Sequence, residues 1–286
     1  MSEKLRLAIQ KSGRLSDSSL QLVKECGIHF NNGRGKLTSF ATNFPMEFLF
    51  LRDDDIPGYV ADGVADIGIV GENVVMEKGM TVTVTKKLGF SKCKLSLAIP
   101  KEKNYPGLTF FNQISIATSY PKILATYLNE NNITADIHEI SGSVEIAPNI
   151  GLADAICDLV SSGSTLLSNG LKEVEILLRS EAVLVSTPEL SPEKSVILDR
   201  FLFRIDAVQT GEKNRYVLLN APNEALDKII KIIPGMKSPT VLPLATEGWS
   251  SVHSVIGEGE FWEVIEKLKA LGAQGILVVP IEKMVI

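Results

Sequence analysis

The chain of 286 residues has no hydrophobic run that approaches the length of a membrane span, and its first residues lack the apolar core of a signal peptide. Cysteine is scarce too. Cys26, Cys93 and Cys157 are an odd number at wide spacing, which is typical of reduced thiols and argues against a disulfide framework. We therefore expect a cytoplasmic protein that has no membrane partner.

Positive charge is also in short supply. The net charge is −5 and no basic stretch could neutralise the phosphates of a nucleic acid, so we expect no nucleic-acid partner. The chain has no Walker loop, no Gly-x-Gly-x-x-Gly and no zinc-binding spacing, and its three histidines share no spacing with one another or with a serine or cysteine. These absences disfavour ATP hydrolysis, dinucleotide chemistry and zinc catalysis.

Short apolar runs do alternate with helical patterns, which is typical of an α/β fold with helices over a largely parallel sheet. With 286 residues, 45% of them hydrophobic, the chain can form two or three domains. We expect strands at residues 5–10, 47–52, 66–70, 81–85, 94–99, 114–118, 135–140, 156–160, 174–178 and 182–186. We expect helices at 16–26, capped by Ser16, at 56–63, 121–131 and 191–208, and from Val144 onward.

Polar segments divide this pattern into parts. Residues 101–107 predict a crossing between two lobes, so the first lobe covers 1–104, completed by 182–208, and the second covers 105–181. Paired lobes of this kind bind ligands in the cleft between them. Residues 209–215 predict a further boundary, and 212–286 follow the order βαββαβ of a ferredoxin-like domain. Such a domain can also serve only to stabilise or oligomerise a protein.

A loop of small and hydroxyl residues follows the expected strand 156–160. Its members are Ser161, Ser162, Gly163, Ser164 and Thr165. Backbone N–H groups at the start of the next helix bind a phosphate without a lysine, the glycine lets the backbone close around it, and the hydroxyls add donors. The alternative is an ordinary turn into a capped helix, because serine and threonine are preferred capping residues.

Two carboxylates, Glu145 and Asp158, flank this loop. A carboxylate repels a phosphate, so we expect them to meet ribose hydroxyls, a developing positive charge or Mg²⁺.

The run from Glu145 through Gly-Leu-Ala-Asp-Ala-Ile-Cys-Asp-Leu to Ser-Ser-Gly-Ser-Thr-Leu resembles the signature of the ATP phosphoribosyltransferase family, which opens histidine biosynthesis. Further matching blocks lie at residues 10–16, 52–58, 62–73, 116–121 and 281–284, so the chain resembles the long, regulated form. The resemblance implies a two-lobed, periplasmic-binding-protein-like catalytic part and a C-terminal regulatory domain. It also implies joining N1 of ATP to C1 of phosphoribosyl pyrophosphate, with pyrophosphate released.

The resemblance also gives the site residues their roles. The loop 161–165 is expected to hold the 5-phosphate, while Asp158 and Glu145 hold the ribose hydroxyls and favour positive charge on the ring. Mg²⁺ is expected to arrive on the pyrophosphate. The residues expected to face ATP or pyrophosphate are Lys11, Arg14, Arg52, Asp66 and Gly71. The three cations can equally be solvated loop charges, and Gly71 can serve packing alone.

Regulation is the last implication of the resemblance. The segment Ser238-Pro-Thr240 matches the family's histidine effector site, so we expect histidine to inhibit, and a homo-hexamer in equilibrium with a dimer. A different class of protein remains as the alternative: a cytosolic two-lobed module that binds or senses a small ligand without catalysis. Such sensors usually carry a helix-turn-helix ahead of the lobes, whereas only a strand and the loop 11–14 stand here.

Overall fold

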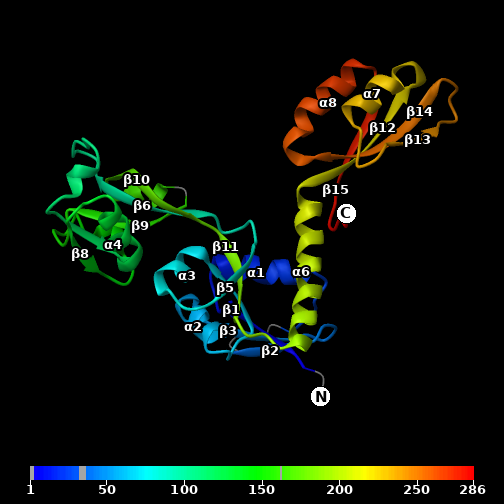
Figure 1. Cartoon of the computed structure of the whole chain (residues 1–286). Helices are drawn as coiled ribbons and strands as arrows, with labels where there is room; N and C mark the ends of the chain where they lie inside the picture. The colour runs from blue at the N-terminus through cyan, green and yellow to red at the C-terminus, as the bar shows by residue number, and fades with distance from the viewer. Residues whose placement is uncertain (1–2, 32–36, 162) are drawn as a thin grey trace. The chain divides into compact units, whose positions relative to one another are not determined.

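The computed structural model describes residues 3–31, 37–161 and 163–286. The chain forms two compact units, one of Met1–Gln21 and Ile28–Ile197 and the other of Leu22–Gly27 and Leu198–Ile286. The first unit contains two sheets and the second contains one (Figure 1). No helix in the described part of the chain has the length and hydropathy that crossing a membrane would require.

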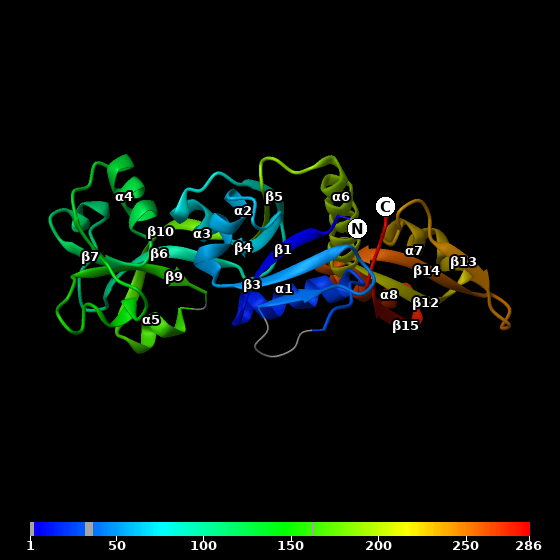
Figure 2. The same ribbon diagram turned by 90° about the horizontal axis from the view of Figure 1, so that it is seen from below.

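The first sheet has the strand order β2-β3-β1-β4-β11-β5. Its strands are β1 (Leu5–Gln10), β2 (Thr38–Phe40), β3 (Met46–Leu51), β4 (Ile67–Gly71), β5 (Thr83–Lys87) and β11 (Ala182–Ser186). β1 runs parallel to β3 and β4, and β11 runs antiparallel to both β4 and β5. Helices α2 (Ile56–Ala61) and α3 (Glu72–Lys78) pack on one face, and α1 (Arg14–Glu25) lies on the other (Figure 2). This sheet and its helices form the first lobe.

The second sheet, of order β10-β6-β9-β7-β8, forms the second lobe. Its strands are β6 (Cys93–Pro100), β7 (Ser115–Thr118), β8 (Asp136–Glu139), β9 (Ala155–Val160) and β10 (Leu171–Ser180). Helices α4 (Pro121–Glu130) and α5 (Ser164–Ser168) lie on opposite faces (Figure 2). Leu124 and Leu128 of α4 pack in one buried cluster and Leu166 of α5 in another, so both faces of the sheet are covered.

The crossing between the lobes differs from its predicted position. β6 was placed in the first lobe, but it pairs with β9 and β10 in the second sheet. The chain crosses between β5 and β6, where Gly89 and Ser91 both adopt positive φ, and it returns between β10 and β11. Residues 101–107 instead form a loop within the second lobe, so that lobe begins near residue 93.

Three helix predictions also need correction. α1 begins at Arg14, so Ser16 is a buried residue inside the helix and does not cap it. The helix expected from Val144 is only a 3-10 turn, Val144–Ile146, because Pro148 cannot donate a backbone hydrogen bond and Gly151 has a φ of 73°. α6 (Pro192–Glu212) continues through most of the expected boundary at 209–215, since polarity alone does not end a helix.

The second unit has the predicted βαββαβ order. Its elements are β12 (Asn214–Pro222), α7 (Leu226–Ile232), β13 (Thr240–Pro243), β14 (Trp249–Gly257), α8 (Phe261–Ala270) and β15 (Gln274–Pro280). The antiparallel sheet has the order β13-β14-β12-β15, which is that of a ferredoxin-like domain. Helices α7 and α8 bury one face through Ile229 and Leu268, while Tyr216, Leu277 and Val279 are exposed.

Candidate active site

A cavity of about 150 Å³ lies where β9 ends and α5 begins. Its lining residues are Glu145, Asp158, Leu159, Val160, Ser161, Gly163, Thr165 and Leu166. The structure therefore brings both predicted carboxylates and three members of the predicted loop around one space. Ser164 is the first residue of α5, and Ser162 lies outside the described residues.

The backbone explains why a glycine stands in this loop. Gly163 has φ 75° and ψ −3°, a left-handed conformation in which it directly precedes α5. The first turn of a helix leaves backbone N–H groups without intrahelical partners, so the turn presents donors to the cavity. Because α5 has only five residues, its dipole is small. A phosphate in this cavity would therefore be held mainly by hydrogen bonds from individual N–H and hydroxyl groups.

The two carboxylates affect each other. Burial raises the pKa of Asp158 above its usual value, and the nearby charge of Glu145 raises it further, while a hydrogen bond from the Leu159 N–H to Asp158 Oδ1 (2.8 Å) works in the opposite direction. Ionisation of Asp158 is therefore less favourable in the empty cavity than it is in water. A cation, or a sugar ring that gains positive charge, would relieve this cost.

The three predicted cations lie at one edge of the first sheet. Lys11 directly follows β1 and Arg52 directly follows β3, and the Lys11 N–H donates to Leu51 O at 2.7 Å. Arg14 opens α1 three residues after Lys11. All three side chains are exposed, and none forms an ion pair with another residue in the described ranges. They are available to an anionic ligand at the carboxyl ends of parallel strands.

Gly71 lies at the carboxyl end of β4, as predicted, but its surroundings favour the packing interpretation. A Cβ on Gly71 would lie 2.4 Å from Asn73 Oδ1, so a larger residue would displace the Asn73 side chain. That side chain is 4% exposed and hydrogen-bonded to Ser180 and Tyr120. Glycine is therefore needed here for the close approach of Asn73.

Asp66 and Gly71 lie at opposite ends of β4. Asp66 stands before the first residue of β4, whereas Gly71 ends the strand, and five strand residues separate points by about 16 Å. Asp66 is 4% exposed, and its carboxylate accepts hydrogen bonds from the Arg6 N–H (2.7 Å) and from Lys194 Nζ (2.8 Å). Its role in the structure is to tie β1 and α6 to β4.

Asp66→Asn should therefore lower the free energy of unfolding by about 3 kcal/mol, because it leaves the Lys194 ammonium without its buried countercharge. The kcat/KM for each substrate should stay within about twofold of the original. Urea unfolding and steady-state kinetics test both points. Asp62→Asn, at an exposed position nearby, is the control and should change neither value. A large loss of ATP affinity at unchanged stability would return Asp66 to the substrate site.

Sequence reasoning did not identify Asn73, Glu77 and Tyr120. Asn73 Nδ2 donates to Tyr120 Oη at 3.1 Å, and Glu77 accepts two backbone hydrogen bonds from α4. Burial raises the pKa of Tyr120 well above its usual value, while the Asn73 amide partly opposes the rise. The partners lie about 45 residues apart in sequence, so no local spacing reveals them. Two signals were available: Asn73 and Glu77 are polar residues four apart on a short helix, and Asn73 and Tyr120 lie in the family-matching blocks 62–73 and 116–121.

The second unit has a cavity of its own, of about 470 Å³. It is lined by Tyr216, Gly235, Met236, Lys237, Ser238, Thr240, His253, Ser254, Val255, Val285 and Ile286. Ser238 and Thr240, the two predicted effector residues, thus face the same space. The His253 ring is fixed by contacts of 2.8 Å from Nδ1 to Tyr216 Oη and 3.0 Å from Nε2 to Ser251 Oγ.

The described residues contain no group of three histidine, cysteine, aspartate or glutamate side chains that could hold a metal ion. Glu145 and Asp158 are the two carboxylates that face the first cavity. Two carboxylates suit a hard cation that keeps its remaining oxygen ligands from water and a phosphorylated substrate. The residues present therefore fit an ion that a substrate carries in.

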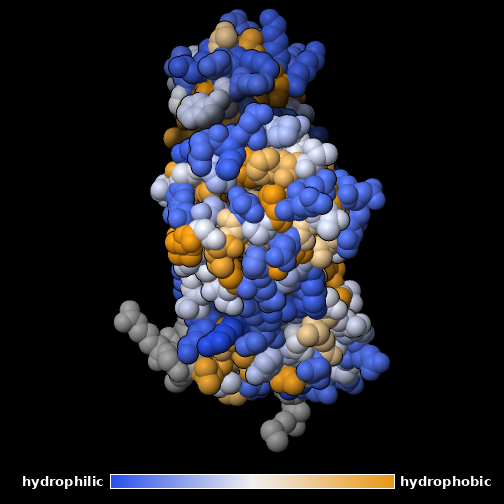
Figure 3. Space-filling view, turned by 90° about the vertical axis from the view of Figure 1, so that its left-hand side faces the viewer, coloured by the Kyte–Doolittle hydropathy of each residue, from blue (hydrophilic) through white to orange (hydrophobic). Residues whose placement is uncertain are grey.

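Exposed hydrophobic side chains are interspersed with hydrophilic ones over the face shown in Figure 3. In the second lobe, the exposed hydrophobic side chains include Ile150 and Leu167, which are 65% and 60% exposed, whichever face they lie on. Both lie close in sequence to residues that line the first cavity.

Comparison with known proteins points in one direction. Residues 52–207 match the family described as ATP phosphoribosyltransferase, and residues 211–283 match the family described as HisG, C-terminal domain. The ATP phosphoribosyltransferase of Cytophaga hutchinsonii is 63% identical over 100% of both chains, and that of Parabacteroides distasonis is 60% identical over 99% of this chain and 100% of its own. A chain of the ATP phosphoribosyl transferase (HisG:HisZ) complex from Thermotoga maritima superposes with a TM-score of 0.61 at 29% identity, over 70% of this chain and 98% of that one.

Proposed function

Because the chain belongs to the ATP phosphoribosyltransferase family, we propose that the cavity at the end of β9 binds the 5-phosphate of phosphoribosyl pyrophosphate. Enzymes of this family transfer a pentosyl group to ATP in histidine biosynthesis. The observation that supports the assignment is the single cavity shared by Glu145, Asp158 and the loop around Gly163. The match covers the whole length of relatives that are ATP phosphoribosyltransferases. We therefore set aside the alternative of a ligand sensor without catalysis.

The reaction itself offers a direct test of the function. Joining the sugar to N1 of adenine changes the adenine chromophore, so a mixture of the protein, ATP, phosphoribosyl pyrophosphate and Mg²⁺ should develop a new ultraviolet difference spectrum. Omitting phosphoribosyl pyrophosphate is the control and should leave the spectrum unchanged. An unchanged spectrum in the complete mixture would reject the transfer activity for this chain.

In this proposal the two carboxylates stabilise positive charge on the sugar ring and do not attack it as nucleophiles. Displacement at an anomeric carbon passes through a transition state in which the ring resembles an oxocarbenium ion, so positioning and electrostatics supply most of the catalysis. Asp158 and Glu145 hold the ribose hydroxyls and place negative charge beside the ring. Burial and Glu145 raise the pKa of Asp158, which means that its negative charge is poorly stabilised when no ligand is bound. A positively charged ring would stabilise that charge, so the interaction would be strongest in the transition state.

The cations of the first lobe complete the site. Lys11, Arg14 and Arg52 lie beyond the carboxyl ends of β1 and β3, and in this proposal they bind the triphosphate of ATP or the departing pyrophosphate. Enzymes of the family need a divalent metal, and we assign Mg²⁺, held by substrate oxygens with Glu145 and Asp158 nearby. The ion supplies neutralisation of the charge on the leaving pyrophosphate.

Histidine is the proposed inhibitor, and the cavity of the second unit is its proposed site. The hydroxyls of Ser238 and Thr240 offer hydrogen bonds to a small polar ligand, and the apolar side chains of Val255 and Val285 offer contact to its ring. Inhibition at this site requires that histidine bind two states of the enzyme with different affinities. The exposed apolar side chains Tyr216 and Leu277 support self-association, and we propose a homo-hexamer in equilibrium with a dimer.

Thr240→Val removes one hydroxyl from this cavity at nearly constant volume. We expect the histidine concentration for half-inhibition to rise about fivefold to tenfold, which corresponds to one lost hydrogen bond, with the KM values for both substrates unchanged. Thr246→Val, at an exposed position outside the cavity, is the control. If Thr240→Val and Thr246→Val respond alike to histidine, the effector binds elsewhere.

The proposed location is the cytoplasm. It is supported by three free cysteines, Cys26, Cys93 and Cys157, of which two are buried.

A further inference from the structure

Helices of the two lobes meet at one point beside the crossing strands. α3 of the first lobe begins directly after β4, and α4 of the second lobe begins shortly after β7. Glu77 Oε1 accepts a hydrogen bond from the Lys122 N–H and Oε2 accepts one from the Ile123 N–H, both at 3.0 Å. These N–H groups are in the first turn of α4, where intrahelical partners are absent. The first lobe thus supplies the cap of a helix in the second.

The second lobe provides no substitute for this cap. Tyr120 occupies the N-cap position of α4 and makes no side-chain capping hydrogen bond. Glu77 is 8% exposed, so water cannot readily replace its carboxylate. The two hydrogen bonds share one rigid carboxylate, which restricts rotation of α4 as well as its separation from α3.

Asn73, one turn earlier on α3, extends the contact. Its Nδ2 donates to Tyr120 Oη, and its Oδ1 and N–H bond to Ser180 Oγ at 2.8 and 3.0 Å. Ser180 is the last residue of β10, where the chain returns to the first lobe. The need for glycine at position 71 follows from this network, because a Cβ there would collide with Asn73 Oδ1. We call Glu77, Asn73, Tyr120 and the α4 N–H groups the clasp.

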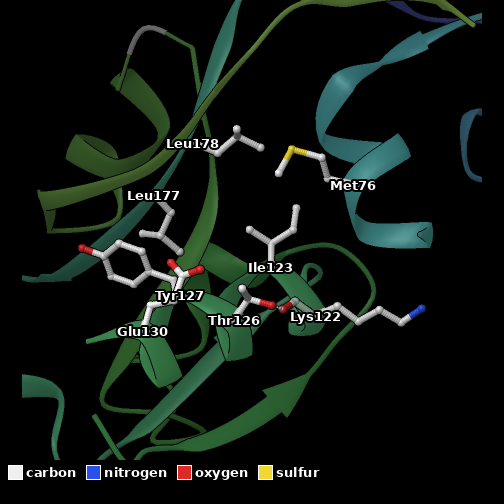
Figure 4. A pocket seen from close by; sticks show the side chains of 8 residues that line it. All are labelled: Met76, Lys122, Ile123, Thr126, Tyr127, Glu130, Leu177 and Leu178. Atoms are coloured by element: carbon white, nitrogen blue, oxygen red, sulfur yellow. Dashed lines mark hydrogen bonds between the residues drawn. The ribbon is translucent and has the colours of Figure 1, made fainter. Parts of the chain in front are cut away.

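Apolar packing next to the clasp is incomplete. A cavity of about 230 Å³ separates α3, α4 and β10, and Figure 4 shows Met76 of α3 opposite Ile123 of α4 and Leu178 of β10. Met76 is 50% exposed. Loose apolar contact cannot fix the spacing of two helices, because a void removes the contact atoms that would resist movement. The hydrogen bonds of the clasp therefore set that spacing.

We propose that Glu77 is a positioning residue for the transfer reaction. Its hydrogen bonds to α4 set the distance and orientation of the second lobe relative to the first. The proposal rests on the assignment of the 5-phosphate to the cavity at the end of β9. The reaction needs N1 of ATP within about 3–3.5 Å of the anomeric carbon, and a misplacement of about 1 Å can cost about a hundredfold in rate. The sugar is held by the second lobe and the ATP phosphates by the first, so their approach depends on the contact between lobes.

Glu77→Gln tests the proposal in the full-length enzyme. Glutamine keeps the length, but its NH₂ faces one of the two α4 N–H groups and cannot accept from it. We expect kcat to fall about tenfold to a hundredfold, while the dissociation constant of phosphoribosyl pyrophosphate stays within about twofold. Hydrogen exchange of the Lys122 and Ile123 amides should become faster. Glu72→Gln is the matched control, since Glu72 lies on the same helix and pairs with Lys87 of the first lobe.

Two results would overturn the proposal: an unchanged kcat, or an equal loss of kcat and of phosphoribosyl pyrophosphate binding, which would make the cap a purely structural support of α4. If Glu77→Gln does not fold, Tyr120→Phe removes the acceptor of the Asn73 amide and must show the same split between kcat and binding. An unchanged kcat in Tyr120→Phe would then also count against it. The phosphate assignment fails separately, if Gly163→Val binds phosphoribosyl pyrophosphate normally.

Discussion

Asp158→Asn should lower kcat about a hundredfold and at the same time make the protein more stable at neutral pH. The loss of rate follows from removing negative charge beside a ring that becomes positive in the transition state, where single electrostatic groups contribute about 10²–10³. Because the interaction strengthens in the transition state, the dissociation constant of phosphoribosyl pyrophosphate should change far less than kcat. Glu145→Gln should act in the same direction. Unchanged kcat in both variants would give the two carboxylates a structural role.

The gain in stability follows from the direction of the pKa shift. Burial and Glu145 raise the pKa of Asp158 in the folded protein above its unfolded value. Below the unfolded pKa of about 4 the carboxyl is protonated in both states, and its contribution to stability is fully present. As the pH rises through the folded pKa, the folded state has to ionise a buried group and that stability is lost. Asparagine cannot ionise, so the variant should have the higher melting temperature at pH 7 and no advantage near pH 3.5.

Asp154→Asn is the matched control, four residues earlier and directly before β9. Asp154 Oδ2 accepts hydrogen bonds from the Ser115 N–H (3.0 Å) and Oγ–H (2.8 Å), which lower the pKa of Asp154. A lowered folded pKa contributes stability above the unfolded pKa, and that stability is lost as the pH falls. Asp154→Asn should thus destabilise the protein at pH 7, with kcat unchanged. If both variants shift the melting temperature in the same direction, the environment assigned to Asp158 is incorrect.

Gly163→Val should raise the dissociation constant of phosphoribosyl pyrophosphate about a hundredfold or more, with a much smaller effect on ATP. The nearest atom to a Cβ at this position is Val160 Cγ1 at 3.9 Å, so the protein has room for the side chain. The φ of 75° is the obstacle, because a β-branched residue held there costs on the order of 1–3 kcal/mol. The loop would relax to another conformation and its N–H groups would turn away from the phosphate. Calorimetric titration with each substrate measures the two effects separately.

Gly151→Val separates backbone strain from loss of the site. Gly151 has a φ of 73° and no atom within 4 Å of an added Cβ, and it does not line the cavity. Both variants should therefore lose similar stability, and only Gly163→Val should lose affinity for phosphoribosyl pyrophosphate. Equal effects of Gly163→Val on both substrates, in a folded protein, would reject the phosphate assignment.

The sequence predicted the site best where one short segment carries it. Asp158 and the loop around Gly163 are contiguous, so strand, turn and helix chemistry place them together without further information. The βαββαβ order was predictable because β12, β14 and α8 are long and periodic, whereas β13 has only four residues and α7 seven. The sequence also placed Glu145 beside the loop, although 12 residues, of which only 155–157 belong to β9, separate it from Asp158.

The remaining features depend on contacts between distant segments. In the sequence, Asp66 and Gly71 belong to the same short apolar segment, so both were assigned to one site. The structure places them at opposite ends of β4 and pairs Asp66 with Lys194. The partners of Glu77 could not be predicted, because they are backbone groups, which carry no sequence identity. The predicted lobe boundary was wrong because the chain crosses where Ser91 has a positive φ, and a serine in the sequence does not predict that conformation.

The path of the chain through the two sheets also fixes the order in which the lobes can be completed during synthesis. The second sheet uses β6 to β10, an unbroken segment, whereas the first sheet needs β11 between β4 and β5. At about 5–20 residues per second, the ribosome makes β11 on the order of 5–20 s after β5. Until then β4 is an unpaired edge of the first sheet, and β5, whose partner is β11, cannot join that sheet. The lobe that starts later in the sequence is therefore the one whose sheet is complete first, because its last strand, β10, precedes β11 in the chain.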